Sequence, residues 1–232
     1  MCGRFAFYSA HEAIARLFGV PDAPEVEPHW NIAPTQFVAA VRERPGAGRR
    51  IVLLYWGLVP GWAKEKSVGA RMINARAETL TEKSAFREAY RRRRCLVLAD
   101  GYYEWQRNGA VKQPYFIGLA SGEPFGMAGL WELWKDRASG EWLESCTIVT
   151  TQPAASIMHL HDRMPVIVPH AAHAEWLDPG NEAVGHLDRL LVPYDAAALT
   201  ARAVSRRVND ARNEGAELID PHLIDAPAGP LI

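Results

Sequence analysis

The sequence predicts an α+β fold, in which a single domain has a largely antiparallel β-sheet or barrel core and peripheral short helices. Short apolar runs of strand length recur along the chain, and the helical patterns between them are short. The two kinds of segment do not alternate as regular βαβ units, which favours antiparallel pairing. We find no repeat, no low-complexity segment and no convincing linker, so the expected domain spans residues 1–232.

The first expected element is a helix from Ser9 to Gly19. Ser9 and Glu12 have the spacing of a capping box, and Gly19 stands where a left-handed residue would end the helix. The next segment, Pro21 to Pro34, is rich in proline and is expected to be irregular.

Apolar runs bounded by turn residues predict strands. The run at Ile51–Trp56 is the first, and a loop with proline and glycine follows it at Gly57–Lys66. The further expected strands are Cys95–Ala99, Tyr115–Leu119, Phe125–Leu133, Ser145–Thr150 and Met164–Val168.

Helical patterns lie between and after these strands. In Ser84–Arg94, Phe86 and Tyr90 share one face. The terminal arginines would form a solvated cap at the negative end of the helix dipole, and phosphate binding is the secondary interpretation of this run. The other expected helices are Pro153–His159, His170–Leu177 and Glu182–Leu191.

The composition indicates a globular protein without a strong charge. Of the 232 residues 48% are hydrophobic and 23% charged, which suffices for a substantial core. The net charge of −1 gives no global basic field that would announce a nucleic-acid partner. Cys2, Cys95 and Cys146 have no metal-ligand spacing, and so sparse a set is typical of a reducing compartment. Cys95 and Cys146 lie in apolar runs, so we expect them to be buried.

Nothing in the sequence indicates a membrane or secretory protein. No apolar stretch has the length of a transmembrane helix, and the first twenty residues lack the apolar core of a signal peptide. We therefore expect a cytoplasmic protein, associated with the nucleoid if bacterial, that has no membrane contact and no obligate protein partner and is a monomer.

Cys2 is the most informative residue. Aminopeptidases usually remove an initiator Met before a small residue, which would leave Cys2 with its α-amine and thiol on adjacent carbons. Such a 1,2-aminothiol condenses with an aldehyde to an imine, and the sulfur then closes a thiazolidine ring. The amine has an ordinary pKa of about 8, and that of the thiol, about 8.5, falls beside a positive charge such as Arg4. The alternative is a frayed terminus with no chemistry.

Two further motifs place polar groups at expected strand ends or turns, where sites are often assembled. Asn74 opens the motif with Arg76, and Glu104 lies among aromatic residues in Gly101–Trp105. Apolar surroundings would raise the pKa of Glu104 and suit it to proton transfer, but a salt bridge at a strand edge explains it equally well.

His161 precedes Asp162 and Arg163 and could be the acid–base partner of a nucleophile. With His159 and Cys2 it could in principle bind zinc, but no fourth ligand suggests itself. We therefore expect no metal and no cofactor.

Tryptophan is usually a core residue. Trp62, in its loop of proline and glycine, is the best candidate for an exposed surface on which bases of a single strand stack.

Seven motifs in order resemble the SRAP family of SOS response-associated peptidases and abasic-site processing proteins. They are MCGRF at 1–5, NIAPTQ at 31–36, WGLVPGWA at 56–63, NARAET at 74–79, GYYEW at 101–105, HDRMPVIV at 161–168 and VSRRVNDARNEGAELI at 204–219. The departures are small: Asp210 stands where the family often has Asn, and Glu214 where Asp is common.

The resemblance implies an SRAP-like fold and a protein that binds abasic sites in single-stranded DNA. After loss of Met1, Cys2 would form a thiazolidine cross-link with the sugar aldehyde and protect the lesion during the DNA damage (SOS) response. Glu104 would accept the proton of the amine, His161 would shuttle a proton to the sugar oxygen, and Asn74 would hold the amine or sugar.

The resemblance also implies a DNA-binding surface and a second activity. Arg4, Arg76 and Arg163 would bind phosphates that flank the lesion, and Trp62 and Trp105 would pack against sugar or bases. The family name further implies an autopeptidase activity that removes Met1.

Two other functions use the same residues. A cysteine hydrolase of the N-terminal-nucleophile type would act through Cys2, His161 and Glu104. A non-catalytic single-strand binding module would need only the arginines and tryptophans, and its affinity would depend on salt but not on Cys2.

Overall fold

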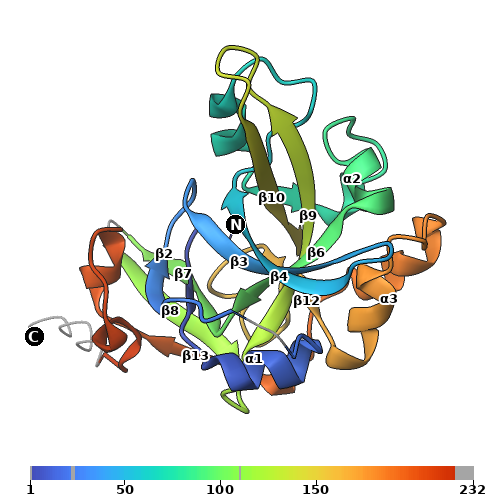
Figure 1. Ribbon diagram of the computed structural model, residues 1–232. Helices are drawn as coiled ribbons and strands as arrows, with labels where there is room; N and C mark the ends of the chain where they lie inside the picture. Colours follow the sequence, from blue (N-terminus) through green and yellow to red (C-terminus); the bar gives the residue numbers. More distant parts are fainter. Residues whose placement is uncertain (1, 22–23, 110, 223–232) are drawn as a thin grey trace, which may run out of the picture.

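The computed structural model describes residues 2–21, 24–109 and 111–222, and within them the strands form two sheets (Figure 1). The five-stranded sheet has the spatial order β13 (Leu199–Ala203), β8 (Val111–Leu119), β7 (Gly101–Asn108), β1 (Phe5–Phe7) and β2 (His29–Ile32). The eight-stranded sheet has the order β11 (Met164–Pro165), β10 (Trp142–Thr151), β4 (Gly48–Trp56), β3 (Phe37–Arg44), β6 (Arg94–Ala99), β9 (Phe125–Lys135) and β12 (Ile167–Val168), and β5 (Asn74–Arg76) pairs with β10.

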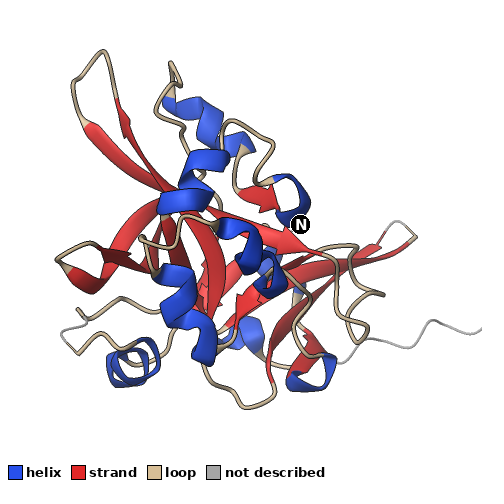
Figure 2. Cartoon of the chain, turned by 90° about the vertical axis from the view of Figure 1, so that its right-hand side faces the viewer, coloured by secondary structure: helices blue, strands red, loops and turns tan. Residues whose placement is uncertain are grey.

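The sheets are largely antiparallel, which confirms the predicted α+β class. Among the described pairings only β10 with β4 and β10 with β5 are parallel. The helices are short and lie around the sheets (Figure 2). They are α1 (His11–Phe18), α2 (Arg87–Arg92) and α3 (His173–Leu177), with 3-10 turns η1 (Lys66–Arg71), η2 (Ala77–Thr79), η3 (His170–Ala172), η4 (Val184–Leu190), η5 (Ala196–Ala198), η6 (Arg206–Asn209) and η7 (Ala216–Ile219). None of the helices in the described residues is long and apolar enough to cross a membrane.

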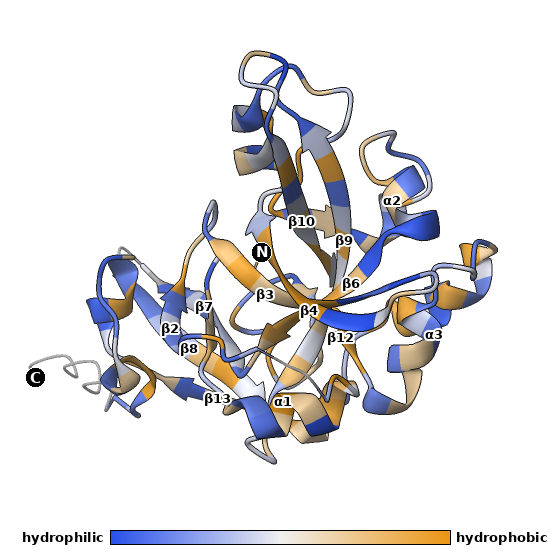
Figure 3. Cartoon of the chain, in the orientation of Figure 1, coloured by the Kyte–Doolittle hydropathy of each residue, from blue (hydrophilic) through white to orange (hydrophobic). Residues whose placement is uncertain are grey.

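The core lies where the two sheets meet, and the most hydrophobic strand segments gather there (Figure 3). Phe5 of the smaller sheet packs edge-on against Trp56 of the larger one, with ring centroids 5.1 Å apart, and both are fully buried. Cys95 and Cys146 are also fully buried, as expected for small apolar residues. This packing ties β1, and so the start of the chain, to the centre of the molecule.

Helix α1 ends as the sequence predicts but begins differently. Gly19 is left-handed at φ 65°, as predicted for the residue after the helix. The predicted capping box is wrong, because the N-cap is Ala10, and the backbone N–H and hydroxyl of Ser9 both donate to Asp100. Ser9 therefore contacts Asp100, far along the chain, and does not cap the helix.

Several other expected elements differ from the structure. The segment expected to be irregular contains strand β2, and its residues 22–23 lie outside the described residues. The expected helix at Pro153–His159 is a series of turns, in which Ile157 donates to the carbonyl of Ala154 and the amide of Ala154 donates to Met164 Sδ. The expected strand Met164–Val168 is two short strands, β11 and β12.

The arginine run is not a solvated cap throughout. Helix α2 ends at Arg92, and Arg94 is buried as the first residue of β6. Its guanidinium donates to the backbone carbonyls of Tyr90, Arg91 and Trp176, among others. Arg94 therefore fastens helix α3 to the end of helix α2.

Candidate functional site

Strand pairing brings Cys2 to Asn74. Strand β5 is held by its parallel pairing with β10, in which Ile148 lies opposite Asn74. Asn74 Nδ2 donates a 2.8 Å hydrogen bond to the carbonyl oxygen of Cys2. Asn74 Oδ1 is buried and accepts no hydrogen bond from any described residue, so an acceptor stands beside Cys2.

The first residues are anchored, which excludes the frayed terminus. The amide of Tyr103 donates to the carbonyl of Arg4, and Phe5 lies opposite Tyr102 in the pairing of β1 with β7. The side chain of Arg4 donates to Asn31 Oδ1 at 2.6 Å and to the carbonyl of Val208 at 2.8 Å. The guanidinium of Arg4 thus holds the terminus to two distant segments, and its contact with DNA stays a prediction.

The environment of the Cys2 thiol is the opposite of the one expected. Cys2 is fully buried, and this burial raises the pKa of its thiol far above the ordinary value, with the negative charge of Glu104 adding to the effect. The backbone of Arg4 opposes the rise through a hydrogen bond, but its guanidinium is not a cause. The prediction that Arg4 lowers the pKa of this thiol is therefore wrong, because that guanidinium faces Asn31 instead.

Glu104 is a buried carboxyl group next to Cys2. It lies on β7, opposite Tyr115 of β8, and only 3% of its surface is exposed. Burial raises its pKa to about 7, and the charge of Asp162 contributes to the rise. The carboxyl group can therefore change protonation state near neutral pH, as the sequence predicts.

Tyr102 lies close to both groups. It is fully buried, and its hydroxyl makes no hydrogen bond with any described residue. Burial raises the pKa of this hydroxyl, and the charges of Cys2 and Glu104 raise it further. No role for Tyr102 was expected from the sequence.

His161 is the half-buried group of the site, between β10 and β11. Burial lowers its pKa, and the positive charge of Arg107 also lowers it, while Asp162 raises it. The ring nitrogen Nδ1 accepts a 3.0 Å hydrogen bond from the amide of Arg163 and lies 2.8 Å from Asp162 Oδ1. Burial favours a neutral ring and the Asp162 carboxylate a protonated one, and this balance would suit a group that takes and returns a proton.

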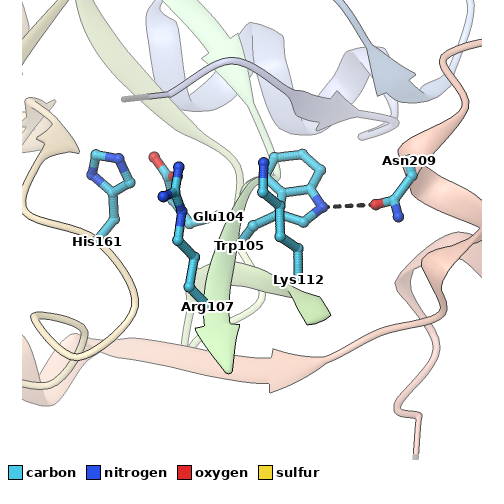
Figure 4. Close-up of a pocket in the computed structure, with 6 residues that line it drawn as sticks. All are labelled: Glu104, Trp105, Arg107, Lys112, His161 and Asn209. Atoms are coloured by element: carbon cyan, nitrogen blue, oxygen red, sulfur yellow. Dashed lines mark hydrogen bonds between the residues drawn. The ribbon is translucent and has the colours of Figure 1, made fainter. Parts of the chain in front are cut away.

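Glu104 and His161 line the same cavity of about 390 Å³ (Figure 4). Its other lining residues are Trp105, Arg107, Lys112 and Asn209. The indole of Trp105 is half-buried, and its Nε1 donates a 2.7 Å hydrogen bond to Asn209 Oδ1. The structure thus connects the four predicted catalytic residues. Cys2 accepts a hydrogen bond from Asn74 and interacts electrostatically with Glu104, and Glu104 and His161 line the same cavity.

The predicted DNA-binding residues differ in whether their side chains are exposed or already bound to other residues. Arg76 on β5 is exposed, and Trp62 is 57% exposed in its loop. Arg163 instead binds both carboxylate oxygens of Glu78, at 2.7 and 2.9 Å, and the carbonyl of Thr150. A phosphate would have to compete with Glu78 for Arg163.

Sequence reasoning missed Arg107, Lys112 and Asn209, which lie in the cavity wall. Only the register of the β7–β8 hairpin, which the sequence does not give, brings the first two together. For metal binding, the described residues contain no group of three or more His, Cys, Asp or Glu side chains that could hold an ion.

Comparison with known proteins finds the same family over most of the chain. The family model of the SOS response associated peptidases (SRAP) matches residues 1–211. The chain is 44% identical over 224 residues to the abasic site processing protein YoaM of Bacillus subtilis, a match that covers 95% of this chain and 98% of that protein. It is 33% identical to the abasic site processing protein YedK of Escherichia coli, with 95% of this chain and all of that protein covered.

Solved structures share the fold. A crystal structure of a protein from Bacteroides thetaiotaomicron has a TM-score of 0.83 at 25% identity, and covers 96% of this chain and all of that one. A second, from Bordetella bronchiseptica, has a TM-score of 0.74 at 28% identity, and covers 88% of this chain and all of that one.

Proposed function

Because the chain belongs to the SOS response associated peptidase (SRAP) family, we propose that it processes abasic sites in DNA. In this proposal it binds the lesion in single-stranded DNA and cross-links to it through Cys2 once Met1 has been removed. It acts as a monomer in the cytoplasm, on the nucleoid in a bacterium, and protects the lesion during the DNA damage (SOS) response. The observation that supports the proposal most is the connected group of Cys2, Asn74, Glu104 and His161.

The reaction joins one aldehyde to one aminothiol and releases one water. The α-amine of Cys2 attacks C1′ of the ring-opened sugar, and loss of water from the resulting carbinolamine gives an imine. The sulfur then attacks the imine carbon, the imine nitrogen takes up a proton, and the thiazolidine ring is closed. An imine alone promotes strand cleavage by β-elimination, whereas the ring does not.

Each neighbouring residue meets a requirement of these steps. The amine must lose a proton before it attacks, and so must a thiol whose pKa is raised, before the ring closes. Glu104, with a pKa of about 7, accepts these protons. His161 donates a proton to the sugar oxygen as the sugar opens, and Asn74 Oδ1 accepts a hydrogen bond from the amine.

The buried thiol favours this chemistry over a cysteine hydrolase. A hydrolase needs a thiolate that attacks first, and burial disfavours the thiolate of Cys2. In the cross-link the amine makes the first bond, and the imine then provides a strong electrophile for sulfur. Removal of Met1 by the protein itself would be a second activity, and it would require the same disfavoured thiolate.

A denaturing gel tests the proposal. Purified protein is mixed with a single strand that carries one abasic site, and wild type should give a stable shifted band. Cys2→Ala keeps a terminal amine but has no sulfur, so it should give a band only after the imine is reduced with borohydride. A chain with a residue kept before Cys2 should give neither band. If wild type gives no band, or Cys2→Ala an equal one without reduction, the proposal fails.

A further inference from the structure

Two basic side chains face each other at the site, on the β7–β8 hairpin. Arg107 of β7 lies directly opposite Lys112 of β8, so their side chains stand on the same face of the sheet. Both line the cavity that contains Glu104 and His161. In Figure 4 their side chains extend in the same direction, between His161 and Asn209.

Within the described part of the chain, no carboxylate forms an ion pair with Arg107 or Lys112, which we call the basic pair. Both side chains are exposed, and neither forms an ion pair or a side-chain hydrogen bond with any described residue. Like charges directly opposite each other on a sheet destabilise it, so the pair has a cost that folding alone does not explain. By contrast, Arg163 is held by Glu78.

We propose that Arg107 and Lys112 together bind one stretch of the DNA backbone beside the abasic sugar, on the strand that carries the lesion. The inference rests on the proposed function, because it takes the cavity to be the place of the sugar. The guanidinium of Arg107 would bind phosphate oxygens as a planar fork, and Lys112 would add a point charge.

Because the basic pair lies at the wall of the cavity, a phosphate bound there would help to position the sugar for reaction. A nucleophile and its target must be brought within about 3–3.5 Å of each other in the correct orientation before they react quickly. A phosphate held at one wall of the cavity restricts where the adjoining sugar can lie, because only a few rotatable bonds join the phosphorus to that sugar. The basic pair would therefore set which sugar reaches Cys2, while Glu104 and His161 carry the protons.

The chemistry favours a phosphodiester over other anions. An acidic protein segment would bring carboxylates toward the buried Glu104, whose negative charge already disfavours the thiolate of Cys2. A DNA strand carries its charge outside the sugar that enters the cavity, so the anion remains at the exposed wall. The positive charge of Arg107 also reaches His161, which indicates how near the pair is to the reacting groups.

Salt dependence of binding tests the proposal without the covalent step. Affinity is measured by fluorescence anisotropy between 50 and 200 mM salt, with a single strand that carries tetrahydrofuran, which has no aldehyde, at the abasic position. Each lost phosphate contact lowers the log–log slope by about 0.7 on single strands, so Arg107→Gln with Lys112→Gln should lower it by about 1.4. Across this range the wild type would lose about sevenfold more affinity than the double variant.

A matched control removes two charges elsewhere. Arg50 on β4 and Arg87 on α2 are also exposed arginines but do not line the cavity. Arg50→Gln with Arg87→Gln should leave the slope unchanged. If both double variants lower the slope equally, the effect is one of overall charge, and the proposal is overturned.

A second measurement locates the contact. Uncharged methylphosphonates replace the phosphates around the lesion one at a time. The wild type should lose affinity at one or two neighbouring positions, and the Arg107→Gln, Lys112→Gln variant should lose none there. Equal losses in both proteins would overturn the proposal. A wild type that binds this DNA but never cross-links to an aldehyde would refute the proposed function and leave the basic pair to be decided by these two results.

Discussion

Replacement of Glu104 by glutamine should separate catalysis from folding, because the same carboxyl group is useful in the first and costly in the second. Burial raises its pKa from 4.5 to about 7, so the folded protein binds this proton more tightly than the unfolded chain does. The favourable contribution to stability is complete below pH 4.5 and is lost as the pH rises to about 7. The shift corresponds to about 3 kcal/mol of unfolding free energy.

Glu104→Gln keeps the shape and removes the charge. At pH 8 the variant should therefore be at least as stable as wild type, by up to about 3 kcal/mol, measured by urea unfolding at pH 5 and pH 8. At pH 5, where the wild-type carboxyl is protonated, the difference should largely vanish. Glu123→Gln, an exposed residue away from the cavity, should change stability little at either pH.

The cross-linking rate of the same variant should fall and change its dependence on pH. Loss of a general base costs roughly 10²–10⁴-fold in rate. In wild type Glu104 must pass the amine proton to solvent and be ionised again before it accepts the thiol proton. Two protons therefore leave the site, and well below pH 7 the rate should rise about a hundredfold per pH unit, since an α-amine has an ordinary pKa of about 8. In the variant only the amine remains, and the rise should be about tenfold per unit.

Two outcomes would contradict the proposed role of Glu104 as the proton acceptor. If Glu104→Gln is less stable than wild type at pH 8, the carboxylate is held by favourable contacts and the residue is structural. If the variant is stable but its pH profile keeps the wild-type steepness, another group accepts the proton. Rates are read from the growth of the shifted band on a denaturing gel at saturating DNA.

Three further outcomes are expected. Asn74→Ala removes the bond to the Cys2 carbonyl and the acceptor beside it, so the cross-linking rate at saturating DNA should fall about tenfold or more while DNA affinity changes little; equal losses in both would make Asn74 a DNA-binding residue. Burial lowers the pKa of His173 from 6.5 to about 4, so its contribution to stability is present above pH 6.5 and is lost as the pH falls to about 4; His173→Gln should flatten this part of the curve of unfolding midpoint against pH, and an unchanged curve would contradict the assignment. In Gly101→Ala the new methyl group would lie 2.1 Å from Phe116 Cζ, which should cost about 1–3 kcal/mol in urea unfolding, and a neutral result would show that the Phe116 ring moves aside.

Strands were easiest to predict from the sequence where both of their faces are buried. Cys95–Ala99 is a continuous apolar run, and every residue of β6 is buried. Strand β7 mixes Tyr, Glu, Gln and Arg, and no run or alternation in it distinguishes a strand from a loop. The expected helix at 153–159 fails for another reason: its amides bond within turns and to Met164 rather than along a helix.

The sequence motifs predicted which residues form the candidate site, but they predicted the electrostatics of these residues only in part. The motifs identify Cys2, Glu104 and His161, and the aromatic neighbours of Glu104 correctly predict a raised pKa. For Cys2 the nearest cation in sequence was a poor guide, because Arg4 turns to Asn31 and burial determines the pKa of the thiol. Strand register and side-chain direction decide which charges lie near a titratable group, and neither can be read from the sequence.

Two motifs that lie far from Cys2 in the sequence, at 31–36 and 204–219, help to anchor the N-terminal segment. Asn31 is fully buried and donates to the carbonyls of Asp210 and Asn213, while its oxygen accepts from Arg4. The C-terminal segment that supplies these carbonyls lies beside β2 in Figure 1.

A terminal amine acts only if its position is fixed to a fraction of an ångström, and chain termini usually have no such restraint. Here Arg4 is bound from two distant parts of the sequence, by Asn31 and by the carbonyl of Val208, and strand β1 pairs with β2 and β7. The side chain of Asp210 does not take part in these bonds, only its carbonyl does, so the departure from the family pattern at this position leaves the anchor intact. Residues 2–7 are thus held as firmly as an internal strand, and the nucleophile proposed at Cys2 would require such a restraint.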